Sequence, residues 1–165
     1  MKKMFLVIFF VLFAGALYAQ DFNKAEKKGF IVEWTVTGEN LSVRLTAPTQ
    51  GWLAIGFGPE KKMQGANIII AYVKNDELFI RDDYGNSQIA HKEDKSSGGT
   101  DNIISASGFE KDKTTTVEFQ IPLDSGDTRD KALVPGNTYK IIIASGRSDN
   151  FTSRHNFDAE LEIKI

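Results

Sequence analysis

Three side chains stand out as candidates for metal binding or proton chemistry: Met63, His91 and His155. Met63 lies in a lysine-rich stretch between two strand-like segments, an unexpected place for an apolar, oxidisable side chain unless its sulfur binds something. Considered alone, it is more simply explained as filling a gap at a core edge. His155 precedes the last strand-like segment, where loops on a rigid scaffold often carry sites, but a structural or exposed role is the simpler explanation. His91 lies among charged residues and is expected to be solvated.

The sequence offers little support for hydrolytic chemistry. No Gly-x-Ser-x-Gly motif is present, and neither histidine has a serine and an acid placed to suggest a triad. The carboxylates that a glycosidase would need lie in or beside polar loops. Two acidic clusters, at 82–86 and 124–130, could hold calcium through oxygen ligands, but neither has the spacing of a known calcium loop. We therefore interpret them as solvated loop acids and expect no catalytic residues and no enzymatic activity.

The start of the sequence predicts export. Two lysines precede an apolar run over residues 4–17, and Ala19 offers a small residue at the exit, as in a secretory signal peptide. We expect cleavage after Ala19, or nearly as well after Gln20, so that residues 20–165 form the mature domain in the periplasm or outside the cell. Losing residues 1–19 removes two positive charges and no acid, which changes the formal net charge from −2 to −4. A mildly acidic domain argues against nucleic acid or anionic lipid as the main partner.

The mature sequence is a series of short strands joined by turns, and no later segment is long and apolar enough to span a membrane. The predicted strands are 30–36, 40–47, 51–58, 66–73, 77–84, 114–123, 138–146 and 158–165. The continuous apolar run at 66–73 is expected to be buried on both faces. Residues 85–100 and 124–137 are expected to be surface loops. This pattern predicts one all-β domain, an antiparallel immunoglobulin-like β-sandwich.

In their order, these segments resemble the DOMON domain, the family that includes the haem-binding cytochrome domain of cellobiose dehydrogenase. The most specific part is "GWLAIGFG" at 51–58 with Met63 after it; weaker matches are "VEWTV", "GANIIIAYV", "LFIRDDYG", "TTTVEFQIPLDSGD" and "TYKIIIASGRSDNF", followed by His155. In haem-binding members, a noncovalent b-type haem lies at one end of the sandwich, bound by a methionine and a histidine from the two corresponding loops. The resemblance therefore implies that Met63 and His155 are the axial ligands of the haem iron.

The resemblance also implies a set of residues around a haem b. The aromatic candidates for the pocket wall are Trp52, Phe57, Tyr72 and Phe151, although the strand register decides which of them face it. Arg154 and Lys62 could meet the propionates at the rim, or simply be solvated cations. Because the sequence contains no cysteine, disulfides, thiolate metal sites and covalent haem attachment are all excluded.

Two departures from the family pattern accompany the resemblance. Asn67 stands where many members carry an acidic residue, which should affect local hydrogen bonding more than ligation. Some DOMON haem subunits use lysine in place of histidine, so Lys61 or Lys62 could compete. Their adjacency to Met63, however, makes ligation on the opposite side of the iron awkward.

The sequence thus predicts an exported b-type cytochrome domain in electron transfer with an unidentified redox partner protein. The alternative, from a different class, is a carbohydrate-binding DOMON module without haem, in which Trp52 and Tyr84 stack on sugar rings. A third possibility is an accessory domain that only docks to an envelope complex.

Overall fold

The computed structural model describes residues 22–165, and the predicted signal peptide at 1–19 lies outside the described residues. Within the described range no helix has the length and apolar character needed to cross a membrane. The strands are β1 (Asn23–Lys27), β2 (Phe30–Thr37), β3 (Asn40–Ala47), β4 (Leu53–Phe57), β5 (Asn67–Lys74), β6 (Glu77–Ser87), β7 (Ala90–Glu93), β8 (Ser105–Lys111), β9 (Thr114–Pro122), β10 (Thr138–Gly146) and β11 (His155–Lys164). One short 3₁₀ helix, η1 (Asp94–Ser97), follows β7.

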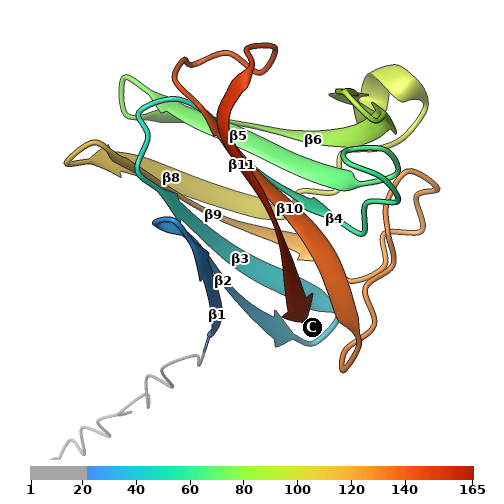
Figure 1. Ribbon diagram of the computed structural model, residues 1–165. Coiled ribbons are helices and arrows are strands. Elements are labelled where there is room, and N and C mark those ends of the chain that lie inside the picture. The colour runs from blue at the N-terminus through green and yellow to red at the C-terminus, as the bar shows by residue number, and fades with distance from the viewer. Residues whose placement is uncertain (1–21) are drawn as a thin grey trace, which may run out of the picture.

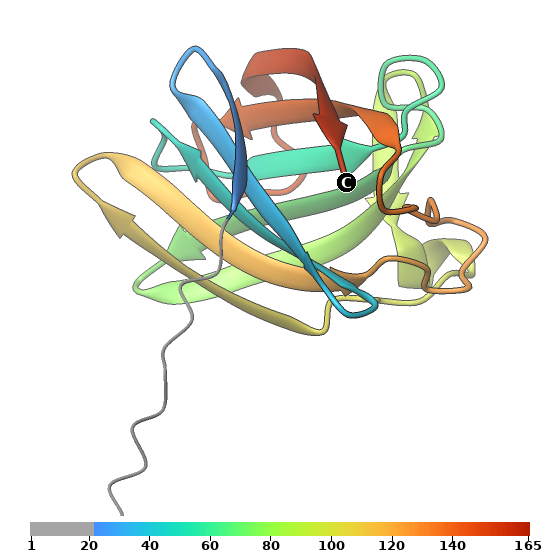
Figure 2. The same ribbon diagram turned by 90° about the horizontal axis from the view of Figure 1, so that it is seen from below.

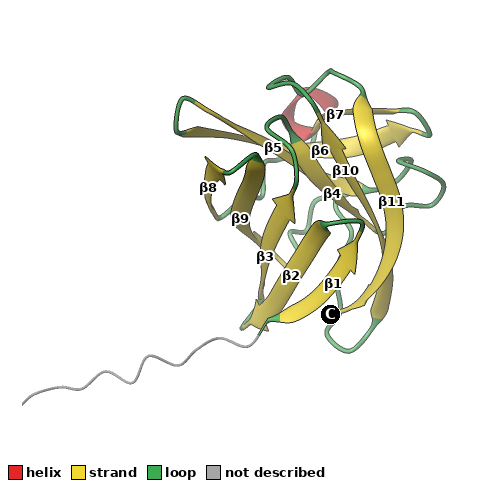
Figure 3. Cartoon of the chain, turned by 60° about the vertical axis from the view of Figure 1, so that its left-hand side comes forward, coloured by secondary structure: helices red, strands yellow, loops and turns green. Residues whose placement is uncertain are grey.

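These strands form two antiparallel sheets stacked as a sandwich, which confirms the predicted fold class (Figure 1; Figure 2). One sheet has the order β1-β2-β3-β9-β8, and the other has the order β11-β10-β4-β5-β6-β7. Figure 3 shows β1 and β11 side by side at one edge, where the two sheets meet. There the indole Nε1 of Trp34 donates a hydrogen bond of 2.8 Å to the carbonyl oxygen of Lys164.

The main hydrophobic core lies between the two sheets and follows from the alternation of the sequence. In β3 every second residue is buried, including Leu41, Val43 and Leu45, while the residues between them are only partly covered. From the other sheet, β4 contributes Leu53, Ile55 and Phe57, all fully buried. Because side chains alternate along a strand, the intervening residues of β4 must face away from this core.

The six-stranded sheet also buries apolar residues on its outer face. A second cluster there comprises Trp52, Ala54, Ala66, Ile68 and Ile70, separate from the main core. This arrangement confirms the prediction that the run 66–73 is buried on both faces. A sheet that is apolar on both faces needs something to cover the outer one.

The differences between the predicted and the observed strands lie at sheet edges or next to loops. β1, β7 and β8 were not expected, and all three are edge strands whose residues are mostly polar or exposed. An edge strand buries little apolar surface, so apolar and polar residues need not alternate along it. The expected loop at 85–100 is therefore wrong in part, because it contains the end of β6, all of β7 and η1.

Candidate binding pocket

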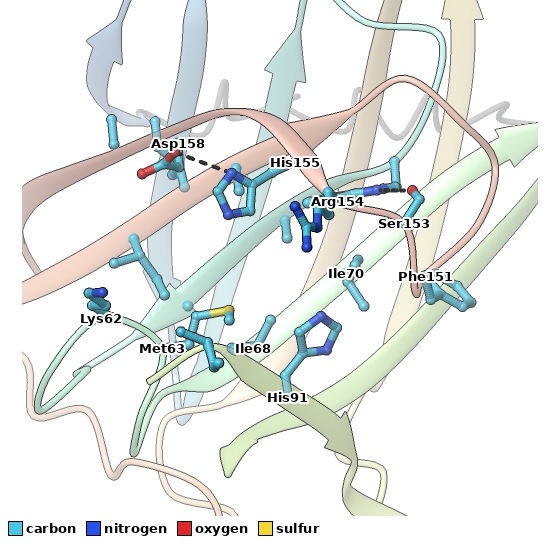
Figure 4. A pocket seen from close by; sticks show the side chains of 18 of the residues that line it. Lys62, Met63, Ile68, Ile70, His91, Phe151, Ser153, Arg154, His155 and Asp158 are labelled. Atoms are coloured by element: carbon cyan, nitrogen blue, oxygen red, sulfur yellow. Dashed lines mark hydrogen bonds and ion pairs between the residues drawn. The ribbon is translucent and has the colours of Figure 1, made fainter. Parts of the chain in front are cut away.

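A pocket of about 820 Å³ lies over the outer face of the six-stranded sheet. It is formed by the loop between β4 and β5, the β6–β7 hairpin, and the loop between β10 and β11 (Figure 4). Its size falls within the range of roughly 300–1,000 Å³ that is usual for small-molecule and cofactor sites. The resemblance places the haem at one end of the sandwich, whereas this pocket lies on a sheet face, because the space between the sheets is filled by the main core.

The floor of the pocket is a shallow apolar trough along β4. Ala54 and Gly56 face the pocket, and larger side chains flank them: Ile68 on β5 and Ile142 on β10 are both paired with Gly56. A Cβ at Gly56 would lie 2.7 Å from Cγ1 of Ile142, so no larger residue fits there without displacing its neighbours. Small residues between isoleucine walls leave a slot suited to a flat, apolar ligand.

The loop carrying Met63 is held close to β6. Gly65 has a φ of 74°, a conformation that favours glycine, and its N–H donates to the carbonyl of Gly85 at 2.8 Å. The N–H of Gly85 in turn donates to the carbonyl of Ala66 at 2.9 Å. The side chain of Met63 is half-buried and packs against the outer apolar cluster, so the lysine-rich loop directs its methionine into the pocket.

The loop between β10 and β11 is fixed by Trp52. The indole Nε1 of Trp52 donates to Oγ of Ser153 at 2.8 Å, and the backbone N–H of Gly146 donates to the carbonyl of Trp52 at 2.8 Å. A Cβ at Gly146 would lie 2.1 Å from Nε1 of Trp52, so only glycine allows this close approach. Trp52 therefore both lines the pocket and positions the segment that leads to His155.

Met63 and His155 enter the pocket from opposite sides, as Figure 4 shows. His155 is the first residue of β11 rather than part of the preceding loop, and it pairs with Gly146 next to a β-bulge. Its Nδ1 lies 3.2 Å from Oδ1 of Asp158, and its side chain is 47% exposed. When Nδ1–H donates to this carboxylate, the neutral imidazole keeps its lone pair on Nε2, the atom left free to bind a metal.

His91 also lines the pocket, which corrects its interpretation as a solvated loop histidine. Its Nδ1 hydrogen-bonds to Oδ2 of the fully buried Asp83, and Arg81 donates to both oxygens of the same carboxylate. Burial by itself raises the pKa of Asp83, but the hydrogen bonds from His91 and Arg81 outweigh it and leave the pKa lowered. No pattern of residues signals this contact, because it depends on a hairpin whose register shifts between Tyr84 and Ser87.

Of the four aromatic residues expected in the pocket wall, two line the pocket and two do not. Trp52 and Phe151 line this pocket. Phe57 does not, because it points from β4 into the main core between the sheets. Tyr72 lies on the outer face but behind the wall, where its ring packs 4.7 Å from the ring of Phe151. The guanidinium of Arg81 lies 4.7 Å from the same Phe151 ring, so it joins this wall to Asp83.

Cationic and anionic side chains surround the apolar floor. Lys62 and Arg154 line the pocket and are both exposed, and they directly precede Met63 and His155 in the sequence. Asp158 and Glu160, which the sequence did not mark as site residues, also line it. The cations are placed to bind an anionic group of a ligand whose apolar part rests on the floor.

The two residues expected as sugar-stacking platforms are each covered in part or in full by other side chains. Trp52 is only 4% exposed, and its indole is engaged with Ser153. The ring of Tyr84 is covered by the guanidinium of Arg129, which lies 5.1 Å from its centroid. The ring of Trp52 is therefore not free to stack on a sugar, and one face of the Tyr84 ring is already occupied.

Comparison with models of known protein families gives the family of this two-sheet sandwich. The family model for the DOMON domain matches residues 26–146, and the chain belongs to this family. Over 118 residues it is 28% identical to DBH-like monooxygenase protein 1 of Mus musculus, which covers 72% of this chain and 18% of that protein. It is also 28% identical over 74 residues to DOMON domain-containing protein FRRS1L of the same species, covering 45% of this chain and 22% of that one. The chain thus spans less than a quarter of the length of either relative.

Two solved structures share the fold. The cytochrome b domain of pyranose dehydrogenase from Coprinopsis cinerea superimposes with a TM-score of 0.67 at 11% sequence identity, covering 87% of this chain and 81% of that one. The cytochrome domain of cellobiose dehydrogenase from Myriococcum thermophilum gives a TM-score of 0.62, also at 11% identity, covering 87% and 82%. These comparisons confirm the predicted resemblance and the fold.

Proposed function

We propose that this domain binds one b-type haem in the pocket and transfers electrons, with Met63 and His155 as the axial ligands. The observation that carries the proposal is the entry of these two side chains from opposite sides of one pocket (Figure 4). A thioether sulfur and a neutral imidazole nitrogen are both accepted by haem iron. The two solved neighbours named as cytochrome domains support the same function.

The rest of the pocket fits a haem. Its floor around Ile68 and Ile142 is apolar, as a porphyrin face requires, and Lys62 and Arg154 at the rim would bind the two propionates. The contact of His155 with Asp158 would hold the imidazole with Nε2 toward the iron, as carboxylates do for metal-binding histidines. Trp52 and Phe151 would close the sides of the site.

Electron transfer is the function that this ligand pair favours. A haem with both axial positions filled by protein side chains supplies a one-electron redox couple and leaves no open position for oxygen or substrate. A thioether ligand raises its reduction potential. We propose that the domain acts in the periplasm or outside the cell and exchanges electrons with a separate redox protein or with another domain of a longer chain.

The test is an absorption spectrum of the protein isolated from a haem-sufficient, exporting cell. We expect one haem per chain and a low-spin, six-coordinate spectrum. Met63→Leu and His155→Ala should each convert it to a high-spin spectrum, because each removes one axial ligand while leaving the apolar floor intact.

His91→Ala is the matched control, because His91 lines the same pocket. It should leave the low-spin spectrum unchanged. A low-spin spectrum that survives His155→Ala but is lost in His91→Ala would overturn the assignment of His155. A protein that contains no haem and takes up none would overturn the proposed function.

A further inference from the structure

Three carboxylates from three separate segments converge at one end of the sandwich, and none of them lines the pocket. Asp82 lies on β6, Asp94 begins η1, and Asp130 belongs to the loop between β9 and β10. One oxygen atom from each of them lies within 4.8 Å of the others. Two oxygens bound to one Ca²⁺ can be at most about 5 Å apart, twice the usual bond of 2.3–2.6 Å. The spacing therefore allows a single cation to contact all three.

Four carboxylate oxygens of this cluster have no hydrogen-bond partner. Asp94 is fully buried, and neither of its carboxylate oxygens is hydrogen-bonded. Asp82 is 2% exposed, and its Oδ1 is also unpartnered, as is Oδ1 of Asp130. Buried polar atoms are almost always paired in folded proteins, so four such oxygens in one place indicate a missing partner.

The opposite oxygens of two of these carboxylates are anchored by the protein. Oδ2 of Asp82 accepts the backbone N–H of Asn102 at 2.9 Å, and Oδ2 of Asp130 accepts the hydroxyl of Ser125 at 2.6 Å. In each of these two carboxylates a donor on Oδ2 fixes the group, while Oδ1 has no partner. Hydrogen bonds of this kind orient the ligands of metal sites.

No side chain of residues 22–165 neutralises the cluster through an ion pair. The nearby Arg129 is engaged elsewhere: its Nη2 donates to the carbonyl of Ser97 at 3.0 Å, and its guanidinium stacks on Tyr84. Burial, with the neighbouring carboxylates, raises the pKa of Asp82 to about 8 and that of Asp94 to about 7. The cluster must therefore either take up protons near neutral pH or bind a cation.

We propose that Asp82, Asp94 and Asp130 bind one Ca²⁺ ion. The available side-chain ligands are all carboxylate oxygens, which suits a hard cation and disfavours zinc or copper. The ligands come from a strand, a short helix and an irregular loop, and Ca²⁺ tolerates irregular geometry where Mg²⁺ demands a near-ideal octahedron. This site is independent of the proposed haem, because none of its three residues lines the pocket.

The ion would tie η1 and the loop between β9 and β10 to β6. Asp82 and Asp83 are consecutive on β6 and therefore point to opposite faces of the sheet. Asp83 holds His91 in the pocket wall, so the ion would fix, from the inner side, the strand that orients this histidine.

The test is calcium titration of the purified protein after removal of metals with EDTA. We expect one Ca²⁺ per chain by calorimetry at pH 8, with an affinity of about 10⁻⁴–10⁻³ M or tighter, as for extracellular calcium modules. The apparent affinity should weaken as the pH is lowered from 8 to 6, because protons compete for the carboxylates. Calcium should also raise the unfolding temperature.

Asp94→Asn should reduce the calcium affinity at least tenfold and abolish the thermal shift. This variant should still fold, because the oxygens that it changes make no hydrogen bond. Asp130→Asn provides a second variant at a less buried position, with the same expected loss. Asp101→Asn is the control, since it removes an equal charge nearby from an exposed residue outside the cluster.

Three results would overturn the proposal. One is the absence of both binding heat and thermal shift in the wild-type protein at millimolar calcium, which would mean that the carboxylates only share protons. The second is a loss of affinity in Asp101→Asn as large as that in Asp94→Asn. The third is a Mg²⁺ response as strong as the Ca²⁺ response, which would overturn the identity of the ion.

The same carboxylates predict how the stability of the metal-free protein depends on pH. Their pKa values in the folded state lie above the ordinary value of 3.8, so the folded protein binds more protons than the unfolded chain between about pH 4 and pH 8. Their contribution to the free energy of unfolding should therefore fall as the pH rises from about 4 and level off above about 8. Urea unfolding in EDTA at several pH values measures this fall, and Asp94→Asn should reduce it. An equal fall of the unfolding free energy in the wild-type protein and in Asp94→Asn would contradict this prediction.

Discussion

Asp83→Asn is expected to lower the free energy of unfolding by about 3–5 kcal/mol, as when one partner of a buried ion pair is removed. The carboxylate of Asp83 is fully buried, and it accepts hydrogen bonds from Nε and Nη2 of Arg81 and from Nδ1 of His91. An asparagine offers a single acceptor oxygen and no charge, so at least one of these donors loses its partner. Urea unfolding followed by tryptophan fluorescence measures the loss.

The pH dependence of this effect has the opposite sign to that of the buried carboxylate cluster. The pKa of Asp83 is lowered in the folded state, so its stabilising contribution is present above the ordinary value of about 4 and is lost only as the pH falls further. The difference between wild type and Asp83→Asn should therefore be full at neutral pH and shrink in acid.

Glu26→Gln is the matched control for Asp83→Asn. Glu26 forms an exposed ion pair of 3.7 Å with Lys24, and such pairs contribute at most about 1 kcal/mol. If Asp83→Asn lowers the free energy of unfolding no more than Glu26→Gln does, the ion pair between Asp83 and Arg81 does not stabilise the β6–β7 hairpin.

The second large effect is expected from Gly85→Ala. A Cβ at this position would lie 1.7 Å from the carbonyl oxygen of Met63 and 2.7 Å from its carbonyl carbon, so the loop or the strand must move. Overpacking commonly costs about 1–3 kcal/mol. The two hydrogen bonds between Gly85 and the loop, to Gly65 and Ala66, would be lost at about 1 kcal/mol each. We expect a total loss of about 3–5 kcal/mol.

This substitution also tests the role of Met63 without altering its side chain. If the sulfur of Met63 binds haem iron, displacement of its backbone should weaken the ligation and raise the high-spin fraction of the haem spectrum. Gly38→Ala is the control: Gly38 has a φ of 61°, and a Cβ added there would have no atom within 4 Å. It therefore brings backbone strain of about 1–2 kcal/mol without a clash. Equal spectra and equal stability for Gly85→Ala and Gly38→Ala would contradict this account.

The central strands of the fold could be predicted from the sequence, because a strand buried on one or both faces must carry its apolar residues at fixed intervals. This holds for β3, which alternates throughout, and for β5, which is almost entirely apolar. The edge strands carry no such constraint, which is why β1 and β8 were missed.

The candidate site could be predicted in part. Met63, His155, Trp52, Phe151 and Arg154 do line one pocket. The sequence could have shown that Trp52 and Phe57 do not both face the pocket, because they are five positions apart on one strand and therefore point to opposite sides. Which of the two faces the pocket depends on the strand register, which the sequence does not give.

Contacts between segments that are distant in the sequence could not be predicted from it. His91 reaches the pocket through a bulged hairpin, and Asp82, Asp94 and Asp130 meet only because two loops fold over the end of the sandwich. Neither a bulge nor the path of a loop follows from residue spacing. The acidic clusters therefore looked like ordinary solvated loops.

The trough along Ala54 and Gly56 has a consequence for what can occupy it. Ala54 and Ile68 are only 6% and 3% exposed, so the floor offers solvent little apolar surface of its own. Its shape depends on the missing side chain at Gly56, because a Cβ there would lie 2.7 Å from Cγ1 of Ile142. One glycine therefore sets the depth of the pocket and with it the thickness of the ligand that fits.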